Sequence, residues 1–418
     1  MIGRAGTIRQ SALMSLLCVG VLLGASFAPA TVGAWESGYA PENTSALAPM
    51  TTTPNGERAE DPSNAVFHGD PMLEGSPISG ATASSLLAID ISSDAMLYEY
   101  NADEPVAPAS TLKIITALTV LTVLEPDNSI QISANDLVDT TVYSNAQLRA
   151  GDEVSVRDLL AGLLIPSGGD AANALARLAG GRLGPQIGQS PGERFVEEMN
   201  AVAESIGMTA SRFVNPDGPD HPDQYTTARD MAVAGAALLD DDLLAEIVAA
   251  PSWTMTVVGP NARQFDVLNT NALIGVDRVN GVKTGTTGQA GESIILATHR
   301  EDNQIIAVIM GSENRYSDVS ILLEHVDNHV RWVQFGSSPD FPNLQASAEE
   351  HQFLLVMQPF VEPMLRTDAA GLVTELELGP LPRGTLPVRW GHVVFLQGDE
   401  ELFQVPVLRT GDSHDRHD

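Results

Sequence analysis

Residues 108–124 read PASTLKIITALTVLTVL, and this stretch decides how the rest of the chain is interpreted. Its apolar residues leave no broad polar face, which predicts a buried helix from about Ser110 to Leu124. The acidic, proline-containing turn at 125–127 ends that helix, because proline cannot continue it. Ser110 and Lys113 lie one helical turn apart on one face. The pattern therefore predicts a hydroxyl and an amine in contact within an apolar setting.

The pair of Ser110 and Lys113 has the form of a nucleophile and its base. A serine hydroxyl is inert at neutral pH unless a neighbouring group takes its proton. Desolvation and the positive end of a helix dipole can keep a lysine neutral enough to do so. The 22 Lys+Arg residues include only two lysines, Lys113 and Lys283. Because arginine cannot serve as a neutral base, both lysines are candidates for chemistry.

The second lysine lies in Lys283-Thr284-Gly285, on a predicted strand. Its lysine and threonine can hold a carboxylate, and its glycine lets a ligand backbone approach the strand edge. A peptide substrate added as an extra strand would fit such an edge. Random placement puts two lysines in Ser-x-x-Lys and Lys-Thr-Gly with a probability on the order of one in a thousand.

A third motif, Ser167-Gly168-Gly169, lies between the two lysines and just before Asp170. We expect Asp170 to cap the N-terminus of the next helix. Taken alone, Ser-Gly-Gly is ordinary turn chemistry. Its place between the two lysine motifs makes Ser167 a candidate for relaying a proton to the leaving group.

Apolar periodicity predicts a largely antiparallel sheet combined with a helical region. We expect helices near 159–165, 171–178, 192–206, 227–239 and 317–335. The expected strands are at 85–91 and 95–100, which form a hairpin, and at 253–258, 281–285, 293–298 and 304–310. Further short strands are expected at 352–357, 371–378, 386–390, 393–396 and 404–408. The last group predicts a small all-β domain at the end of the chain.

A length of 418 residues favours two domains with additional segments. The boundaries we predict are as follows: a signal peptide at 1–34, a flexible spacer at 35–82, a catalytic domain at 83–337, a β-rich domain at 347–410 and a polar tail at 411–418. The uncharged run from residue 10 to 35 has small-residue exits typical of signal cleavage, so we expect export. The alternative is an uncleaved signal anchor, in which case the chain would be membrane-bound.

Composition disfavours several classes of partner and cofactor. A formal net charge of −32 disfavours nucleic acid and anionic lipid surfaces. The single cysteine, Cys18, lies in the predicted signal segment, so no disulfide or cysteine ligand is expected. His325 and His329 are four residues apart but lack the Glu of a zinc-binding helix motif. We therefore expect no metal and no other cofactor.

The three motifs, in this order, resemble the active-serine superfamily of penicillin-binding proteins and β-lactamases. Within it, the chain is similar to the low-molecular-mass D-alanyl-D-alanine carboxypeptidases over roughly residues 83–335. The segments that carry this similarity are Pro108 to Lys113, Phe213 to Pro216, Thr227 to Met231, Asn269 to Asn271 and Gly281 to Gly285. The resemblance implies an α/β (α+β) fold of the β-lactamase/transpeptidase type. That fold has a five-stranded antiparallel sheet with helices on both faces, a helical subdomain and a β-rich C-terminal domain.

The resemblance also implies a function and residue roles. Such enzymes remove the terminal D-alanine from peptidoglycan stem peptides outside the cytoplasm, through an acyl-serine intermediate, and β-lactams inhibit them. Ser110 would attack, Lys113 would accept its proton and Ser167 would assist the leaving group. The substrate would be bound by Lys283, Thr284, Gly285 and Thr286, with the amides of Ser110 and Thr286 as the oxyanion hole.

One position departs from the family pattern. Gly169 stands where the family usually has asparagine, whose amide orients the catalytic lysine and the substrate. The alternatives left open are a weakly active penicillin-binding pseudoenzyme or sensor, and a D,D-endopeptidase. A class A β-lactamase fits less well, because its Ser-Asp-Asn motif is not found here. Asn173, one turn further on, is expected to pack or cap rather than to replace the missing amide.

Overall fold

The computed structural model describes residues 70–73, 75–335, 341, 353–355, 360–379, 388–398 and 400–409. The predicted signal segment 1–34, residues 35–69 of the predicted spacer and the polar tail 411–418 lie outside these residues. Among the residues that are described, no helix is both long enough and apolar enough to cross a bilayer.

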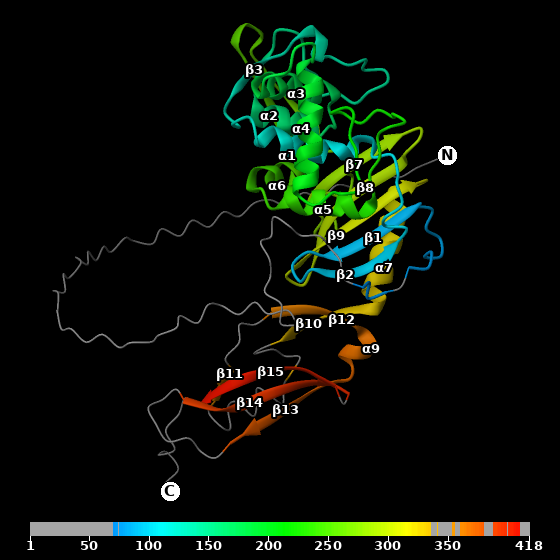
Figure 1. The fold of residues 1–418 in the computed structure, drawn as a ribbon, viewed down its shortest axis with the longest axis vertical. Helices are drawn as coiled ribbons and strands as arrows, with labels where there is room; N and C mark the ends of the chain where they lie inside the picture. The colour runs from blue at the N-terminus through cyan, green and yellow to red at the C-terminus, as the bar shows by residue number, and fades with distance from the viewer. Residues whose placement is uncertain are drawn as a thin grey trace, which may run out of the picture. The chain divides into compact units, whose positions relative to one another are not determined.

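The main sheet has five strands in the order β2-β1-β9-β8-β7, and every neighbouring pair is antiparallel (Figure 1). This arrangement confirms the predicted antiparallel sheet and the predicted N-terminal hairpin. Strand β7, which carries the second lysine motif, lies at one edge of the sheet. The strands are β1 (Ser85–Asp90), β2 (Ala95–Tyr100), β7 (Gly281–Thr287), β8 (Gly291–Arg300) and β9 (Asn303–Ser312).

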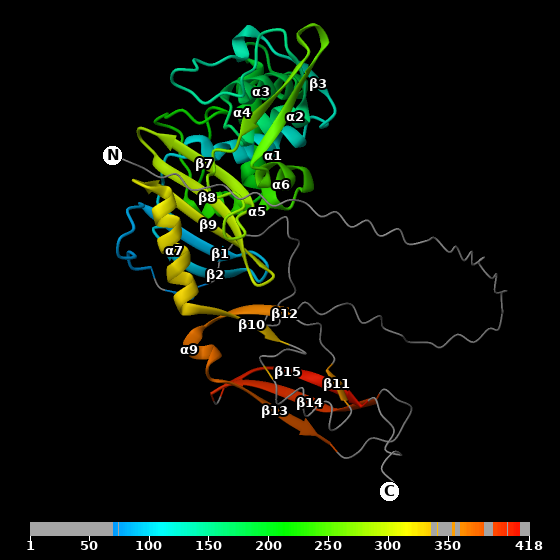
Figure 2. The same ribbon diagram turned by 180° about the vertical axis from the view of Figure 1, so that it is seen from behind.

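Helices cover both faces of this sheet, because its strands are apolar on both sides. Leu87 and Ile89 of β1 belong to the core shared with the helical region, whereas Leu86 and Ala88 belong to a separate core. The second core includes Leu322 of α7 (Arg315–His329), the helix that crosses this face in Figure 2. Alternate residues of one strand thus serve two opposite helix layers.

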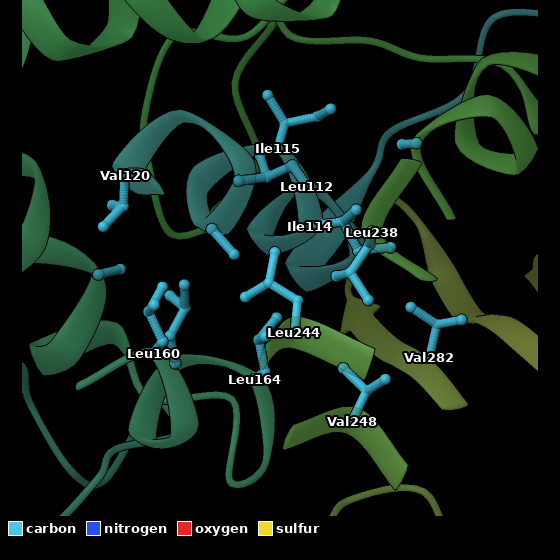
Figure 3. Packing of buried hydrophobic residues seen from close by; sticks show 14 of the residues in the cluster. Leu112, Ile114, Ile115, Val120, Leu160, Leu164, Leu238, Leu244, Val248 and Val282 are labelled. Atoms are coloured by element: carbon cyan, nitrogen blue, oxygen red, sulfur yellow. The ribbon is translucent and has the colours of Figure 1, made fainter. Parts of the chain in front are cut away.

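The helical region packs around the helix that follows the catalytic serine. Leu112 and Ile114 meet Leu164 and Leu244 in one continuous core, which Figure 3 shows. The helices of this region are α1 (Lys113–Leu121), α2 (Val156–Leu164), α3 (Gly169–Leu183), α4 (Pro191–Ser205), α5 (Ala228–Leu239) and α6 (Asp242–Ala249). Helix α6 was not predicted. Gly207 follows the end of α4 with a φ of 95°, as a C-terminal capping glycine should.

A second antiparallel sheet lies in the helical region, in the order β3-β4-β5-β6. Its strands are β3 (Ser129–Gln131), β4 (Glu153–Ser155), β5 (Ser252–Val258) and β6 (Arg263–Leu268). Only β5 was predicted. Ser155 caps α2 through a bond from the Asp158 amide. The Asp158 carboxylate binds the Trp253 indole at 2.8 Å, so it joins α2 to this sheet.

The last long helix is shorter than predicted. We expected a helix over 317–335, but α7 ends at His329 and β10 (Val330–Phe335) follows it. In β10 the buried residues Val333 and Phe335 alternate with exposed ones, which is a strand pattern. β10 pairs antiparallel with β12 (Phe360–Leu365), a strand that was not predicted.

The remaining C-terminal strands form an antiparallel sheet in the order β11-β15-β14-β13. They are β11 (Phe353–Leu355), β13 (Leu372–Leu378), β14 (Val388–Gln397) and β15 (Glu400–Arg409), and a short helix, α9 (Arg366–Ala369), precedes β13. The runs predicted at 386–390 and 393–396 belong to one strand. A register shift between Arg389 and Gly391 lets β14 continue through the residues that separate the two runs.

Some residues before the predicted boundary at residue 83 are bonded to the main sheet. The amides of Met72 and Leu73 donate to Met96 and Leu97 of β2. These bonds place the end of the expected spacer against the open edge of the main sheet.

Candidate active site

Ser110 lies in a tight 3-10 turn, Ala109–Leu112, that leads into α1. The predicted helix therefore starts with 3-10 geometry. Lys113 is the first residue of α1, and its Nζ donates to the Ser110 Oγ at 2.9 Å. The structure thus brings together the two residues that the sequence predicts as nucleophile and base.

Lys113 is 2 % exposed, and its surroundings tune its basicity. Burial lowers the pKa of Lys113 to about 8, while the nearby carboxylates of Asp217 and Asp170 pull in the opposite direction. A pKa near the working pH suits a general base, which must be neutral before the reaction and able to hold a proton after it.

Two glycines allow other segments to approach the serine turn closely. A Cβ on Gly285 would lie 3.1 Å from the Ser110 amide nitrogen and from the Ala109 Cβ. A Cβ on Gly218, where φ is +101°, would lie 2.4 Å from the Ala109 carbonyl oxygen. The glycine of the second lysine motif therefore makes room for the serine turn, whereas we had expected it to make room for a ligand backbone.

Lys283 is buried on edge strand β7, where its Nζ donates to the Thr284 carbonyl at 2.9 Å. Burial lowers its pKa well below the ordinary value, and the positive charges of Lys113 and Arg315 add to this effect. The Thr284 hydroxyl shares a 2.7 Å hydrogen bond with Thr270. Because the charge of Lys113 acts on Lys283, the two lysine motifs belong to one site.

Arg315 is a site residue that sequence reasoning missed. It begins α7 and is 7 % exposed. Its guanidinium donates to the carbonyls of Gly285 and Ser293, each at 2.9 Å, and to the Thr286 hydroxyl. In the sequence, Arg315 stands out only as the residue after Asn314, the N-cap of α7. That position does not predict a contact with Gly285, which lies 30 residues earlier.

Ser167 is 5 % exposed and has a left-handed backbone with a φ of 63°. Its Oγ has no hydrogen-bond partner among the described residues. Asp170 was predicted as the helix N-cap, but this was wrong, because Gly168 holds that position. The Asp170 carboxylate instead accepts from the Ala146 and Leu148 amides at 2.7 and 3.2 Å, and so fixes a neighbouring loop.

Two other polar residues, Asn173 and Asp217, also need to be placed, of which only Asn173 was considered from the sequence. Asn173 donates to the Asp136 carbonyl at 3.2 Å, which is the packing role expected of it. Asp217 was missed, although its carbonyl accepts a hydrogen bond from Lys113 Nζ. Within the described residues, no group of three or more His, Cys, Asp or Glu side chains is arranged to hold a metal ion.

A family model described as D-alanyl-D-alanine carboxypeptidase, peptidase S11, matches residues 74–314. The chain belongs to the D-alanyl-D-alanine carboxypeptidase family. The match spans all three motifs, and it ends just before Arg315.

Relatives in this family come from several bacteria. The chain is 34 % identical over 245 residues to D-alanyl-D-alanine carboxypeptidase DacC of Escherichia coli, covering 55 % of this chain and 57 % of DacC. It is 30 % identical over 255 residues to DacF of Bacillus subtilis, covering 58 % of this chain and 61 % of that protein. The chain thus spans about three-fifths of the length of these relatives.

Solved structures show the same fold. The DD-transpeptidase of Streptomyces K15 is 28 % identical, with a TM-score of 0.55, and the match covers 60 % of this chain and 98 % of that one. DacD of Francisella tularensis is 22 % identical, with a TM-score of 0.57 over 82 % of this chain and 96 % of that one. The family and the fold thus agree with the expected β-lactamase/transpeptidase-like architecture.

Proposed function

We propose that this protein is a serine-type D-Ala-D-Ala carboxypeptidase that removes the terminal D-alanine from peptidoglycan stem peptides and binds β-lactams. The observation that carries the proposal is the 2.9 Å bond between the buried Lys113 amine and the Ser110 hydroxyl, beside an edge strand with a second buried lysine. Membership of the D-alanyl-D-alanine carboxypeptidase family supports the choice of substrate.

In the acylation step, the Ser110 oxygen attacks the carbonyl carbon of the penultimate D-alanine. Lys113 takes the hydroxyl proton, and the amides of Ser110 and Thr286 stabilise the charge on the carbonyl oxygen. The C–N bond then breaks, and the terminal D-alanine leaves after its nitrogen gains a proton through Ser167. The product is an ester between the shortened peptide and Ser110, which water hydrolyses in the second step.

The substrate carboxylate is assigned to the cationic end of the site. Lys283 and Thr284 would bind it, and Arg315 would hold Gly285 and Thr286 in place through its bonds to β7. Because β7 is an edge strand, the stem peptide can lie beside it as an additional strand.

The proposal is tested with protein that lacks residues 1–34. It should release D-alanine from a peptide ending in D-Ala-D-Ala and should be labelled by fluorescent penicillin at Ser110. Labelling that survives Ser110→Ala would refute the assignment. Rapid labelling without steady D-alanine release would instead indicate a penicillin-binding pseudoenzyme, and cleavage of cross-linked peptides would indicate an endopeptidase.

The role of Lys113 as base has its own control. Lys113→Arg should acylate almost as slowly as Lys113→Ala, because arginine keeps its proton. Near-normal acylation by the arginine variant, followed by stopped-flow fluorescence, would exclude the mechanism.

We also propose that the chain is exported and acts outside the cytoplasm, with 1–34 as its signal peptide. The proposed division has a spacer at 35–82, whose last part from Met72 onward is bonded to β2, a catalytic domain at 83–337, a β-rich domain at 347–410 and a tail at 411–418. Mass spectrometry of the exported form would show whether cleavage occurs near residue 34 or whether the segment stays as an anchor.

A further inference from the structure

Gly169, two residues after Ser167, has a carboxylate close to the point where a side chain would begin. A Cβ on Gly169 would lie 3.1 Å from Val138 Cγ1, 3.5 Å from the Asp217 Oδ2 and 3.6 Å from the Ser144 carbonyl oxygen. A longer side chain growing from this point would meet the Asp217 carboxylate. The absence of a side chain at 169 and the position of Asp217 are therefore linked.

Asp217 also contacts the catalytic lysine directly. Its backbone carbonyl accepts a hydrogen bond from Lys113 Nζ, the same atom that donates to Ser110. The next residue, Gly218, packs against the carbonyl of Ala109. The segment around Asp217 thus joins the serine turn, the lysine and the surroundings of Gly169.

We propose that Asp217 is a positioning residue for Lys113, and that its carboxylate takes the place of the amide side chain missing at Gly169. This inference rests on the proposed function, because it assigns a partner to the base of that reaction. It also explains how the site can work without the usual asparagine.

A carboxylate suits this task because the base becomes a cation during the reaction. When Lys113 accepts the proton of Ser110, a nearby negative charge stabilises the ammonium that forms. Burial alone would lower the pKa of Lys113 further, and Asp217 is the larger of the two acidic influences that oppose this. The same burial raises the pKa of Asp217, and the charge of Lys113 lowers it.

The other charged groups near Lys113 are less suited to positioning it. The Asp170 carboxylate is already held by the amides of Ala146 and Leu148. A positive charge on Lys113 lowers the pKa of Lys283, so Lys283 opposes the lysine ammonium and cannot hold it. Asp217 is therefore the acidic side chain whose removal should change the base most directly.

The first test is Asp217→Asn, which keeps the backbone carbonyl and removes the charge. The acylation rate with fluorescent penicillin is measured from pH 5 to 9. With the charge removed, the pKa of Lys113 falls. The pH at which the acylation rate begins to drop on the acidic side should therefore be lower by about one unit. The plateau rate should fall about tenfold because the lysine is a weaker base. Asp223→Asn, an exposed charge on the same loop, is the matched control and should keep the wild-type profile.

The second test is a double-mutant cycle of Gly169→Asn and Asp217→Ala. In the wild-type background, the new side chain meets the carboxylate, and acylation should slow. In the Asp217→Ala background, the contact with the carboxylate is gone while the contact with Val138 is the same as before, and the new side chain restores an amide. Acylation should therefore rise by about tenfold over Asp217→Ala alone. Gly169→Asn is thus expected to slow acylation in one background and to speed it in the other. This opposite effect can be tested even if Asp217→Asn folds poorly.

Two results would overturn the inference: an unchanged pH profile for Asp217→Asn, or purely additive effects in the cycle. Each of these leaves the proposed function intact, provided that the wild-type protein is labelled at Ser110. Absence of labelling in the wild type overturns the proposed function and the inference together.

Discussion

Arg315 donates a hydrogen bond from Nη1 to the Gly285 carbonyl oxygen at 2.9 Å. The bond joins the start of α7 to the edge strand that carries Lys283. The same nitrogen donates to Ser293 on the neighbouring strand β8. The guanidinium therefore fixes the spacing of two strands at the point where the oxyanion hole is proposed.

Arg315→Lys should damage the site despite keeping the charge. A lysine cannot reproduce the fork that serves Gly285, Ser293 and Thr286 together. We expect kcat/KM for D-alanine release to fall by about tenfold to a hundredfold, because the Thr286 amide loses its position. The exposed Arg278, which donates to the Glu301 carbonyl, offers the control Arg278→Lys. Equal activities of the two variants would contradict this role of Arg315.

Ser167→Ala should lower the activity of the enzyme without lowering its stability. The Ser167 Oγ is buried and lacks a hydrogen-bond partner among the described residues, so its removal relieves an unsatisfied polar group. We expect the free energy of unfolding to stay the same or to rise by up to about 1 kcal/mol. D-alanine release should nevertheless fall by about a hundredfold or more, because proton transfer to the leaving group is lost. Thermal unfolding and steady-state kinetics on one preparation measure both, and parallel losses would indicate a structural role instead.

Local patterns predicted those parts of the site and fold that depend on near neighbours. Ser110 and Lys113 are three residues apart, so helical spacing alone predicts their contact. The hairpin of β1 and β2 followed from two short apolar runs around a turn. In each case the physical cause acts within a few residues.

Contacts across the fold were not predictable in this way. Arg315 meets Gly285 only because α7 and β7 come together in three dimensions. Asp217 lies 104 residues from Lys113 in sequence, and although it directly follows the segment Phe213 to Pro216, that segment does not predict a contact with the lysine. The end of α7 was misplaced because Val330 and the residues after it are apolar enough to suit either a helix or a strand. Pairing with β12 decides between them.

Glu362 on β12 makes stability depend on pH. Burial, and to a smaller extent the charge of Asp90, raises its pKa from 4.5 to about 7. Asp90 is fully buried and accepts hydrogen bonds from Asn303 at 2.7 Å and from the Trp332 indole at 2.8 Å. Because the folded state holds the Glu362 proton more tightly, this group stabilises the fold below pH 4.5. That contribution is lost as pH rises through about 7.

Glu362→Gln should therefore be more stable than the wild type at pH 8, because the amide carries no charge to bury. After allowance for partial exposure of the side chain, the gain should be about 1 to 2 kcal/mol at pH 8 and close to zero at pH 5. Urea unfolding at a series of pH values measures it. Glu375→Gln, which changes an exposed carboxylate on β13, should follow the wild-type curve. A Glu362→Gln curve parallel to the wild type from pH 5 to 8 would show that Glu362 titrates at its ordinary pKa, since only a raised pKa makes the difference between the proteins grow in this range.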